Sequence, residues 1–467
     1  MRRGHRHNPT PPQRKRKSPE SRGAHLQREG ESNGKLPTHR NARGAQEEQS
    51  EGCNGIRIAK HVDPMTPAPF KTAAAPTQAA RTRRHFRLLI LASAILHLAT
   101  TPSGAGSLPS PYDIDPSAAH PRNTEGSFIT LKSGRILLNY SQFSGGAEDF
   151  DRAQIAEIHS DDQGETWSRP RVVVDTGTHR NVMSVSLLRL ASGRIARFHA
   201  FKNSRLSDCH VVMSTSDDEG ATWSPPRAIH DAPGYFVLNN DRVIQTHSGR
   251  LIVPMAFHRL KGSGDDWASW DSRGLALWYY SDDEGATWRE SDNWWALPIA
   301  SRSGLQEPGV VELNNGNIYS WSRTDRGMQY QYWSKDDGKS FGPPEPSPFV
   351  SPNSPLSIKR IPGTNTLVAV YNDHSGRVPK PASERQRAPL VISLSRDEAR
   401  SWDSPRVIEG DLSGWYCYTA IHFTKDTVLL AYVAGNERIG RLSRLRIRRI
   451  PIEWLAAGQS EALDHAR

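Results

Sequence analysis

Short runs of apolar residues that alternate with polar ones recur along the chain from about residue 127, and they come in pairs. Within most pairs a tight turn containing Gly joins the two runs, which is a hairpin signal. Six such pairs occur, in the segments 127–140, 184–200, 241–257, 309–322, 356–371 and 420–433. No helical period competes over this region. The pattern therefore predicts an all-β fold built from repeated hairpins.

An octapeptide, S-x-D-x-G-x-[ST]-[WF], follows five of the hairpins. Its copies lie at 160–167, 216–223, 281–288, 334–341 and, with Ala399 in place of the glycine, 395–402. Recurrence at such a period indicates a repeat architecture. With a further strand on each side of the octapeptide, six units over 107–455 predict a six-bladed β-propeller of four-stranded antiparallel blades. A strand from the start of the domain should close the last blade.

The octapeptide itself has a structural interpretation. Its Asp can accept hydrogen bonds from amides of its own turn, its Gly can take a positive φ, and its aromatic residue can pack between units. Calcium loops share the D-x-D-x-G spacing, but they need a glutamate at the twelfth position and flanking helices. We expect these turns to be structural and remote from the functional face.

The first hundred residues differ in composition from the rest. They hold 19 of the 60 Lys+Arg but only 7 of the 50 Asp+Glu, so the charge of +10 belongs to them and nothing indicates nucleic acid as a partner. Residues 1–80 should be a disordered basic extension. Residues 81–105 combine a basic segment, an apolar run and small residues, which is typical of a signal peptide and too short to span a membrane.

These features predict a secreted or periplasmic protein that is not stably inserted in a membrane after processing. The mature chain should start near residues 100–107, and residues 456–467 should form a C-terminal tail. Met65 is a candidate for the true start, and a basic extension before an internal membrane anchor is the alternative. Of the three cysteines, Cys209 and Cys417 would remain in the mature chain, and the sequence favours free thiols over a disulfide bridge between them. No Cys/His spacing suggests a metal site, and no cofactor is expected.

Propeller topology predicts which residues share a face. The loop entering the first strand and the loop between the second and third strands open on the face opposite the octapeptides. That face collects Arg122, Asn123, Glu125, Glu148, Asp149, Asp151, Arg152, Arg180, Asn181, Lys202, Arg205, Asn239, Asn240, Asp241, Arg242, His258, Trp267, Trp270, Arg273, Glu307, Arg323, Arg387, Trp415, Tyr416 and Tyr418. Several arginines around one axis favour an anionic ligand, because guanidinium groups pair with carboxylates at any working pH.

With these residues and octapeptides, the chain resembles the sialidase (neuraminidase) superfamily over about residues 115–450, and the octapeptides are similar to its Asp-boxes, or BNR repeats. The resemblance implies a tyrosine nucleophile paired with a glutamate, an aspartate acid/base and three arginines for the substrate carboxylate. The segment 307–327 implies Glu307 and Arg323, and the segment 387–402 implies Arg387. The segment WYCYTAIHF (415–423) contains both Tyr416 and Tyr418, of which Tyr418 is favoured because it directly precedes the strand.

Two segments depart from the family pattern, and both fall in the first blade. HPRNTEGSF (120–128) replaces the usual Arg-Ile-Pro, so Arg122 can act as the first arginine only if the backbone there is similar. GGAEDFDRA (145–153) leaves Asp149 and Asp151 both eligible as the acid/base. These departures weaken the expectation of sialic acid itself more than that of the fold.

The function predicted from the sequence is a secreted, exo-α-sialidase-like glycoside hydrolase that removes terminal acidic sugars from glycoconjugates. Further substrate contacts are expected from Glu125, Asn181, Asp241, Arg242 and His258. One alternative is a glycosidase or lyase for another acidic polysaccharide, such as a uronate polymer. The other is a non-catalytic carbohydrate-binding propeller, which requires neither the tyrosine–glutamate pair nor an acid. The sequence does not indicate an oligomeric state.

Overall fold

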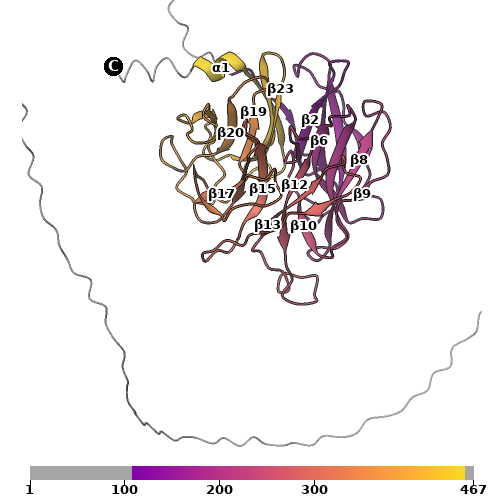
Figure 1. Ribbon diagram of the computed structural model, residues 1–467. Helices are drawn as coiled ribbons and strands as arrows, with labels where there is room; N and C mark the ends of the chain where they lie inside the picture. Colours follow the sequence, from indigo (N-terminus) through magenta and orange to yellow (C-terminus); the bar gives the residue numbers. More distant parts are fainter. Residues whose placement is uncertain (1–107, 458–467) are drawn as a thin grey trace, which may run out of the picture. The chain divides into compact units, whose positions relative to one another are not determined.

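The computed structural model describes residues 108–457, which form sheets of antiparallel strands and one short helix (Figure 1). Four of the sheets have four strands each, and a nine-stranded sheet contains two further blades joined by a bridging strand. The first strands of neighbouring blades lie beside one another, except that blades 2 and 3 are joined through β10, and β2 also lies beside β23, so the ring closes. The fold is a six-bladed β-propeller, as the sequence predicts.

The first three blades follow the chain in order. Blade 1 contains β2 (Asn123–Thr130), β3 (Ile136–Phe143), β4 (Ala153–Ser160) and β5 (Arg171–Val174). Blade 2 contains β6 (Asn181–Arg189), β7 (Ile195–Lys202), β8 (Cys209–Ser216) and β9 (Arg227–Ala228). Blade 3 contains β11 (Ile244–Gln245), β12 (Leu251–His258), β13 (Leu275–Ser281) and β14 (Arg289–Glu290).

The remaining blades repeat the arrangement. Blade 4 contains β15 (Gln306–Glu312), β16 (Ile318–Arg323), β17 (Met328–Ser334) and β18 (Glu345–Val350). Blade 5 contains β19 (Ser357–Arg360), β20 (Leu367–Asn372), β21 (Leu390–Ser395) and β22 (Arg406–Glu409). Blade 6 contains β23 (Trp415–Phe423), β24 (Thr427–Gly435), β25 (Leu445–Pro451) and β1 (Tyr112–Ile114), and α1 (Ile452–Ala457) follows it.

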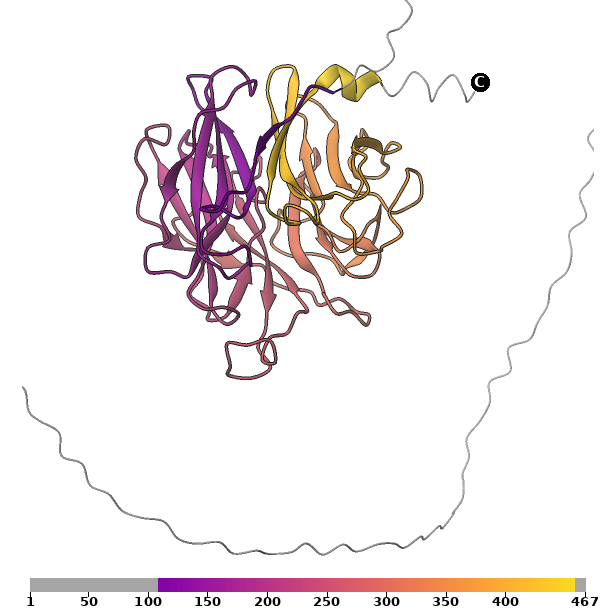
Figure 2. The ribbon, with the colours of Figure 1, turned by 180° about the vertical axis from the view of Figure 1, so that it is seen from behind.

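The closure of the ring joins the two ends of the propeller. Strand β1 pairs with β25, with Tyr112 opposite Ile447, so the earliest strand supplies the outer edge of the last blade (Figure 2). Salt bridges from Arg446 to Asp113 at 2.8 Å and from Arg444 to Asp115 at 2.6 Å lie along this seam. The predicted closure is therefore confirmed, and β1 covers the outer edge of β25 over Leu445–Ile447.

One strand was not predicted. Strand β10 (Tyr235–Val237) pairs antiparallel with β12 and touches β8 in parallel, with Tyr235 opposite Cys209. It joins blades 2 and 3 into one sheet and carries Tyr235 to the functional face. A three-residue strand whose partners lie in two blades has too little periodicity of its own to be recognised in the sequence.

The octapeptide turns form the hydrogen bonds expected of them. In the copy at 281–288, Asp283 accepts bonds from the Thr287 amide at 2.8 Å and from the Ser281 hydroxyl at 2.8 Å, and the Ser281 oxygen accepts from the Gly285 amide at 2.8 Å. Aromatic residues that close the octapeptides pack on the preceding blade. The ring of Phe341 stacks on Trp278 with centroids 3.8 Å apart, for example. These turns therefore stabilise the contacts between blades.

Several predictions concern residues outside the described range. The basic extension at 1–80, the whole signal peptide at 81–105, most of the tail at 456–467 and the proposed start at Met65 lie there, so the domain boundaries and export remain predictions. Within residues 108–457, no helix is long and apolar enough to cross a membrane. Cys209 and Cys417 are both buried as free thiols.

Candidate active site

A repeated backbone feature brings side chains to one mouth of the channel. Five non-glycine residues near the entrance of the first strands of five blades have φ values between 49° and 60°: Glu125, Ser184, Asp241, Glu307 and Tyr418. In β2, β6, β15 and β23 these residues coincide with a shift of strand register. A bulge with left-handed backbone redirects a side chain, and such strained positions cluster at functional sites.

Glu307 and Tyr418 meet at this mouth, although they come from blades 4 and 6. The Tyr418 hydroxyl donates to Glu307 Oε1 over 3.5 Å, and Arg323 Nη2 donates to the same oxygen at 2.8 Å. Asn239 Nδ2 donates to the other carboxylate oxygen at 2.7 Å. Burial, reinforced by the charge of Glu307, raises the pKa of the Tyr418 phenol well above its usual value. The phenol is therefore neutral and faces a fixed carboxylate.

The choice between the two tyrosines follows from the bulge. Tyr416 is buried in the core of blade 6, where its ring packs edge-on against Tyr432 with centroids 6.5 Å apart. In a regular strand, residues 416 and 418 would point to the same face. The left-handed backbone at Tyr418 breaks that alternation, so only Tyr418 lines the pocket.

Arg387 lies over the ring of Tyr418. Its guanidinium carbon is 5.4 Å from the Tyr418 ring centroid and 5.5 Å from that of Trp415. Among the described residues, its Nη1 has no hydrogen-bond partner. Burial disfavours the charge of Arg387, but Cys417 and Tyr418 outweigh burial and keep its pKa above the ordinary value. Arg387 lines a neighbouring cavity that shares Gln306 with the main pocket.

Arg122 is almost completely buried, with 1% of its surface exposed. Its Nη1 donates to Asp149 Oδ1 at 2.6 Å, and its Nη2 donates to Glu125 Oε2 at 3.2 Å. Partial desolvation disfavours the charge of Asp149, but Arg122 and then Lys202 outweigh it and hold the pKa of Asp149 well below its usual range. The side chain of Asp149 is nevertheless 63% exposed, on the loop between β3 and β4. Arg122 is thus occupied by carboxylates of the chain itself.

The two aspartates of this loop have different environments. Asp149 lines the pocket. The carboxylate of Asp151 turns back into the loop, where it accepts the Glu148 amide at 2.9 Å. The Asp151 carbonyl accepts a bond from Asn181 Nδ2 at 2.6 Å. Asn181, predicted as a substrate contact, therefore supports the loop and does not line the pocket.

Two more predicted contacts lie inside the channel and do not line the pocket. Asp241 accepts bonds from Ser127 Oγ at 2.9 Å, Lys359 Nζ at 2.7 Å and the Ile421 amide at 3.0 Å, which joins blades 1, 5 and 6. Arg242 lies over the Trp321 ring at 5.6 Å, and burial lowers its pKa to about 10. Both residues hold the blades together beneath the site.

His258 and Glu125 do line the pocket. The His258 ring stacks on Trp270 with centroids 4.5 Å apart, and burial lowers its pKa to about 4, so it is neutral at physiological pH. Glu125 accepts the Ser184 hydroxyl at 2.9 Å, and burial raises the pKa of Glu125 against the opposing effect of Arg122.

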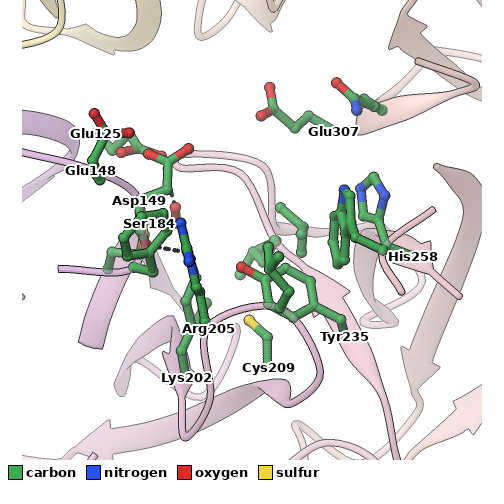
Figure 3. A pocket seen from close by; sticks show the side chains of 18 of the residues that line it. Glu125, Glu148, Asp149, Ser184, Lys202, Arg205, Cys209, Tyr235, His258 and Glu307 are labelled. Atoms are coloured by element: carbon green, nitrogen blue, oxygen red, sulfur yellow. Dashed lines mark hydrogen bonds between the residues drawn. The ribbon is translucent and has the colours of Figure 1, made fainter. Parts of the chain in front are cut away.

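The pocket also contains residues that the sequence did not single out. Figure 3 shows Glu307 on one side, Asp149 and Ser184 on another, and Tyr235 with Cys209 at the floor. The unpredicted part of the lining consists of Phe150, Met183, Ser184, Ala200, Leu206, Cys209, Tyr235, Val237, Leu238 and Gln306. Ser184 was detectable in the sequence, because it stands as far before its hairpin glycine as Glu125 and Glu307 stand before theirs.

Comparison with known proteins identifies the family and supports the fold. The model of the BNR repeat-like domain family matches residues 134–430. The chain belongs to this family, within the sialidase superfamily. It is 25% identical over 328 residues to a sialidase of Micromonospora viridifaciens, an alignment that covers 62% of this chain and 46% of that protein. The chain spans about half the length of the named sialidases it matches.

Solved structures show the same fold at lower identity. A Dyadobacter fermentans protein of unknown function has a TM-score of 0.58 and 17% identity, covering 74% of this chain and 99% of that one. NanB sialidase of Streptococcus pneumoniae has a TM-score of 0.56 and 15% identity, covering 74% of this chain and 71% of that one. At such identity, the likeness establishes the β-propeller and leaves the substrate to be argued from the pocket.

Proposed function

We propose that the pocket is the active site of a retaining glycoside hydrolase for terminal sugars that carry a carboxylate on the anomeric carbon, as sialic acid does. The observation that carries the proposal is the contact between Tyr418, Glu307 and Arg323. A carboxylate nucleophile would be repelled by the carboxylate of such a sugar, whereas a phenol is not. A neutral phenol is a weak nucleophile, and Glu307 is the group placed to take its proton.

In the first step, the Tyr418 oxygen would form a bond to the anomeric carbon while the glycosidic bond breaks. The phenol proton passes to Glu307, and Asp149 donates a proton to the leaving oxygen. In the second step, water attacks the anomeric carbon and gives its proton to Asp149. The Tyr418 oxygen then leaves and recovers its proton from Glu307, so the protein returns to its initial state.

Asp149 must carry a proton for the first step, yet its pairing with Arg122 favours the ionised form. We propose that the substrate carboxylate competes with Asp149 for Arg122, with Arg323 and Arg387 as its other partners. Loss of the Arg122 contact would raise the pKa of Asp149 when substrate is bound. The exposure of Asp149 and its position on a loop support such a movement.

A hydrolysis screen tests the proposal. Aryl α-sialosides, natural sialosides and uronate oligosaccharides would be offered to the purified protein and to two variants, Tyr418→Phe and Tyr416→Phe. Both variants lose one buried hydroxyl from the same strand, but only Tyr418 lines the pocket. We expect turnover of an α-ketosidic acid sugar by the wild type and by Tyr416→Phe, and at least about a thousandfold loss in Tyr418→Phe.

The outcome also separates the alternatives. Unsaturated products from uronate oligosaccharides would identify a lyase and overturn the proposal. Binding of acidic sugars without turnover of any compound would favour a carbohydrate-binding propeller. Equal turnover by Tyr418→Phe and wild type would exclude the tyrosine mechanism.

A further inference from the structure

Two cationic side chains line the blade 2 wall and the floor of the pocket, apart from the arginines already described. Lys202 ends β7, and Arg205 lies in the loop that follows (Figure 3). Within residues 108–457, neither side chain forms an ion pair with a carboxylate. The carboxylate beside them, that of Asp149, is paired with Arg122. Neither charge is therefore in direct ion-pair contact with an anion of the pocket, although Lys202 lies close enough to the Asp149 carboxylate to lower its pKa.

Lys202 is buried, with 5% of its surface exposed. Its ammonium donates to the Asp149 carbonyl at 2.6 Å and lies 5.6 Å from the centre of the Tyr235 ring. An ammonium has three donors, and a neutral donor could hold that carbonyl equally well. Burying a charge is costly unless it is paired. The geometry thus leaves Lys202 able to bind a further acceptor at the floor.

Arg205 is positioned from two sides. Its guanidinium carbon lies 4.2 Å from the centre of the Phe150 ring and 5.7 Å from that of Trp267. The Asp265 carboxylate accepts the Arg205 amide at 2.8 Å and the Leu206 amide at 2.6 Å, which fixes the backbone. Aromatic contacts engage the face of a guanidinium and leave its N–H edge for a planar anion.

We propose that Lys202 and Arg205 form a second anion-binding subsite, so that the sugar acid accepted by this pocket carries a second carboxylate remote from its anomeric carboxylate. The inference deepens the proposed function and rests on it for the orientation of the sugar. Tyr418, Glu307 and Arg323 receive the reacting end. The floor beside Lys202, Tyr235 and Cys209 receives the far end. A dicarboxylic keto sugar acid has the matching charge at both ends.

The test compares two acids of equal chain length. One is a 2-keto-3-deoxy sugar acid with a terminal hydroxymethyl group, and the other has a carboxylate at that position. Their dissociation constants would be measured by calorimetry with the full chain, and hydrolysis of their aryl α-glycosides would be measured in parallel. We expect the diacid to bind wild type at least about tenfold more tightly, as a charge-assisted pair requires.

Arg205→Gln and Arg180→Gln are the matched variants. Both arginines approach the Phe150 ring, Arg180 at 5.8 Å, but Arg180 does not line the pocket. Arg205→Gln should reduce the diacid preference about tenfold, whereas Arg180→Gln should retain the preference. Arg205→Lys keeps the charge and should restore part of it. These variants separate recognition by Arg205 from a general loss of positive charge.

Equal affinity of wild type for the two acids would overturn the inference, as would equal losses for both acids in Arg205→Gln. Hydrolysis of the monoacid glycoside without a diacid preference would refute the second subsite and leave the proposed function intact. A diacid preference that Arg205→Gln abolishes, without hydrolysis of either glycoside, would support the subsite and refute the hydrolase. Failure of both acids to bind, together with no hydrolysis of either glycoside, would refute both.

Discussion

Left-handed backbone at non-glycine residues occurs at both ends of the blades, and the two ends use it differently. Of eleven such residues within the described range, five lie at the channel mouth, and six lie in the octapeptide turns: Gln163, Glu219, Glu284, Asp337, Glu398 and Ala399. At the turn end, Glu284 accepts the Ser192 amide of the preceding blade at 2.8 Å, and Glu398 accepts the Asn314 amide at 2.8 Å. These side chains join blades.

At the mouth, the same backbone conformation carries five residues of different chemistry. Glu125, Ser184, Glu307 and Tyr418 line the pocket, and Asp241 binds groups from three other blades beneath it. The comparison shows that repetition of a side-chain pattern accompanies a structural role. Where only the backbone conformation repeats, each blade can present a different side chain to the pocket. The predictions below test this division between stability and catalysis, from the largest expected effect to the smallest.

Glu307→Gln should abolish nearly all hydrolysis, by about a thousandfold or more, because the Tyr418 proton then has no acceptor. It should also lower the stability, since the partly buried pair with Arg323 is lost. Glu157→Gln is the control, because Glu157 is also buried and ion-paired, with Arg171 at 2.6 Å, but lies in β4. Activity per folded molecule should fall only in Glu307→Gln. A similar fall in both variants would contradict the assignment of catalysis to the residues at the channel mouth.

Asp149→Asn should reduce turnover by about a hundredfold on substrates with poor leaving groups, and less on aryl glycosides, because only the former need protonation of the leaving oxygen. Asp151→Asn should have a much smaller effect, since its carboxylate is directed into the loop. The ratio of kcat/KM for the two substrate types measures how strongly each variant depends on the leaving group. A larger leaving-group dependence in Asp151→Asn than in Asp149→Asn would assign the acid/base role to Asp151.

Asp283→Ala should lower the free energy of unfolding by about 1–2 kcal/mol through lost turn hydrogen bonds, with activity per folded molecule unchanged. Asp282→Ala is the matched control. Asp282 forms an exposed salt bridge with Arg250 at 2.6 Å, which contributes about 0–1 kcal/mol. Denaturant unfolding measures both variants. Loss of activity at full stability would place the turn at the active site.

Acid should weaken the turn end by a smaller amount. Hydrogen bonds from the turn threonines lower the pKa of Asp162, Asp218 and Asp283 from 3.8 to about 2. Because these pKa values are depressed in the folded state, their contribution is present above about pH 4 and is lost as the pH falls toward 2. The thermal midpoint of Asp283→Asn should fall less steeply over that window than that of wild type. An identical slope would show that the turn carboxylate contributes nothing.

The sequence predicted the fold because its evidence is local and repeated. The six hairpins and the octapeptide turns each have a short pattern, and the closing strand follows from the need to cover the edge of the last blade. At the site, the sequence brought Glu307, Arg323 and Tyr418 to one mouth through topology alone. It favoured Tyr418 over Tyr416 only by its position before the expected strand, whereas both lie within β23, and it left Asp149 and Asp151 open. A bulge and a loop conformation distinguish the residues in these two cases.

The remaining differences have tertiary causes. Arg122 is engaged by Asp149 and Glu125, a contact set by the folding of the blade 1 loop over β2. Asn181 and Asp241 have the polarity of ligand-binding residues but bind backbone and side-chain groups of other segments. Tyr235 reaches the pocket on β10, whose pairing spans two blades. None of these contacts is marked by a local sequence pattern, because each one depends on segments that only the complete fold brings together.

The central claim is that Tyr418 forms a bond to the sugar during turnover. A fluorinated sugar acid with a good leaving group, which slows hydrolysis of the glycosyl-enzyme, would be incubated with wild type and with Glu307→Gln, and peptides would be mapped by mass spectrometry. The account predicts one adduct in wild type, on Tyr418 within residues 415–423, and almost none in Glu307→Gln. An adduct on Tyr416, on Asp149 or on Glu307 itself, or release of the leaving group without any adduct, would contradict it.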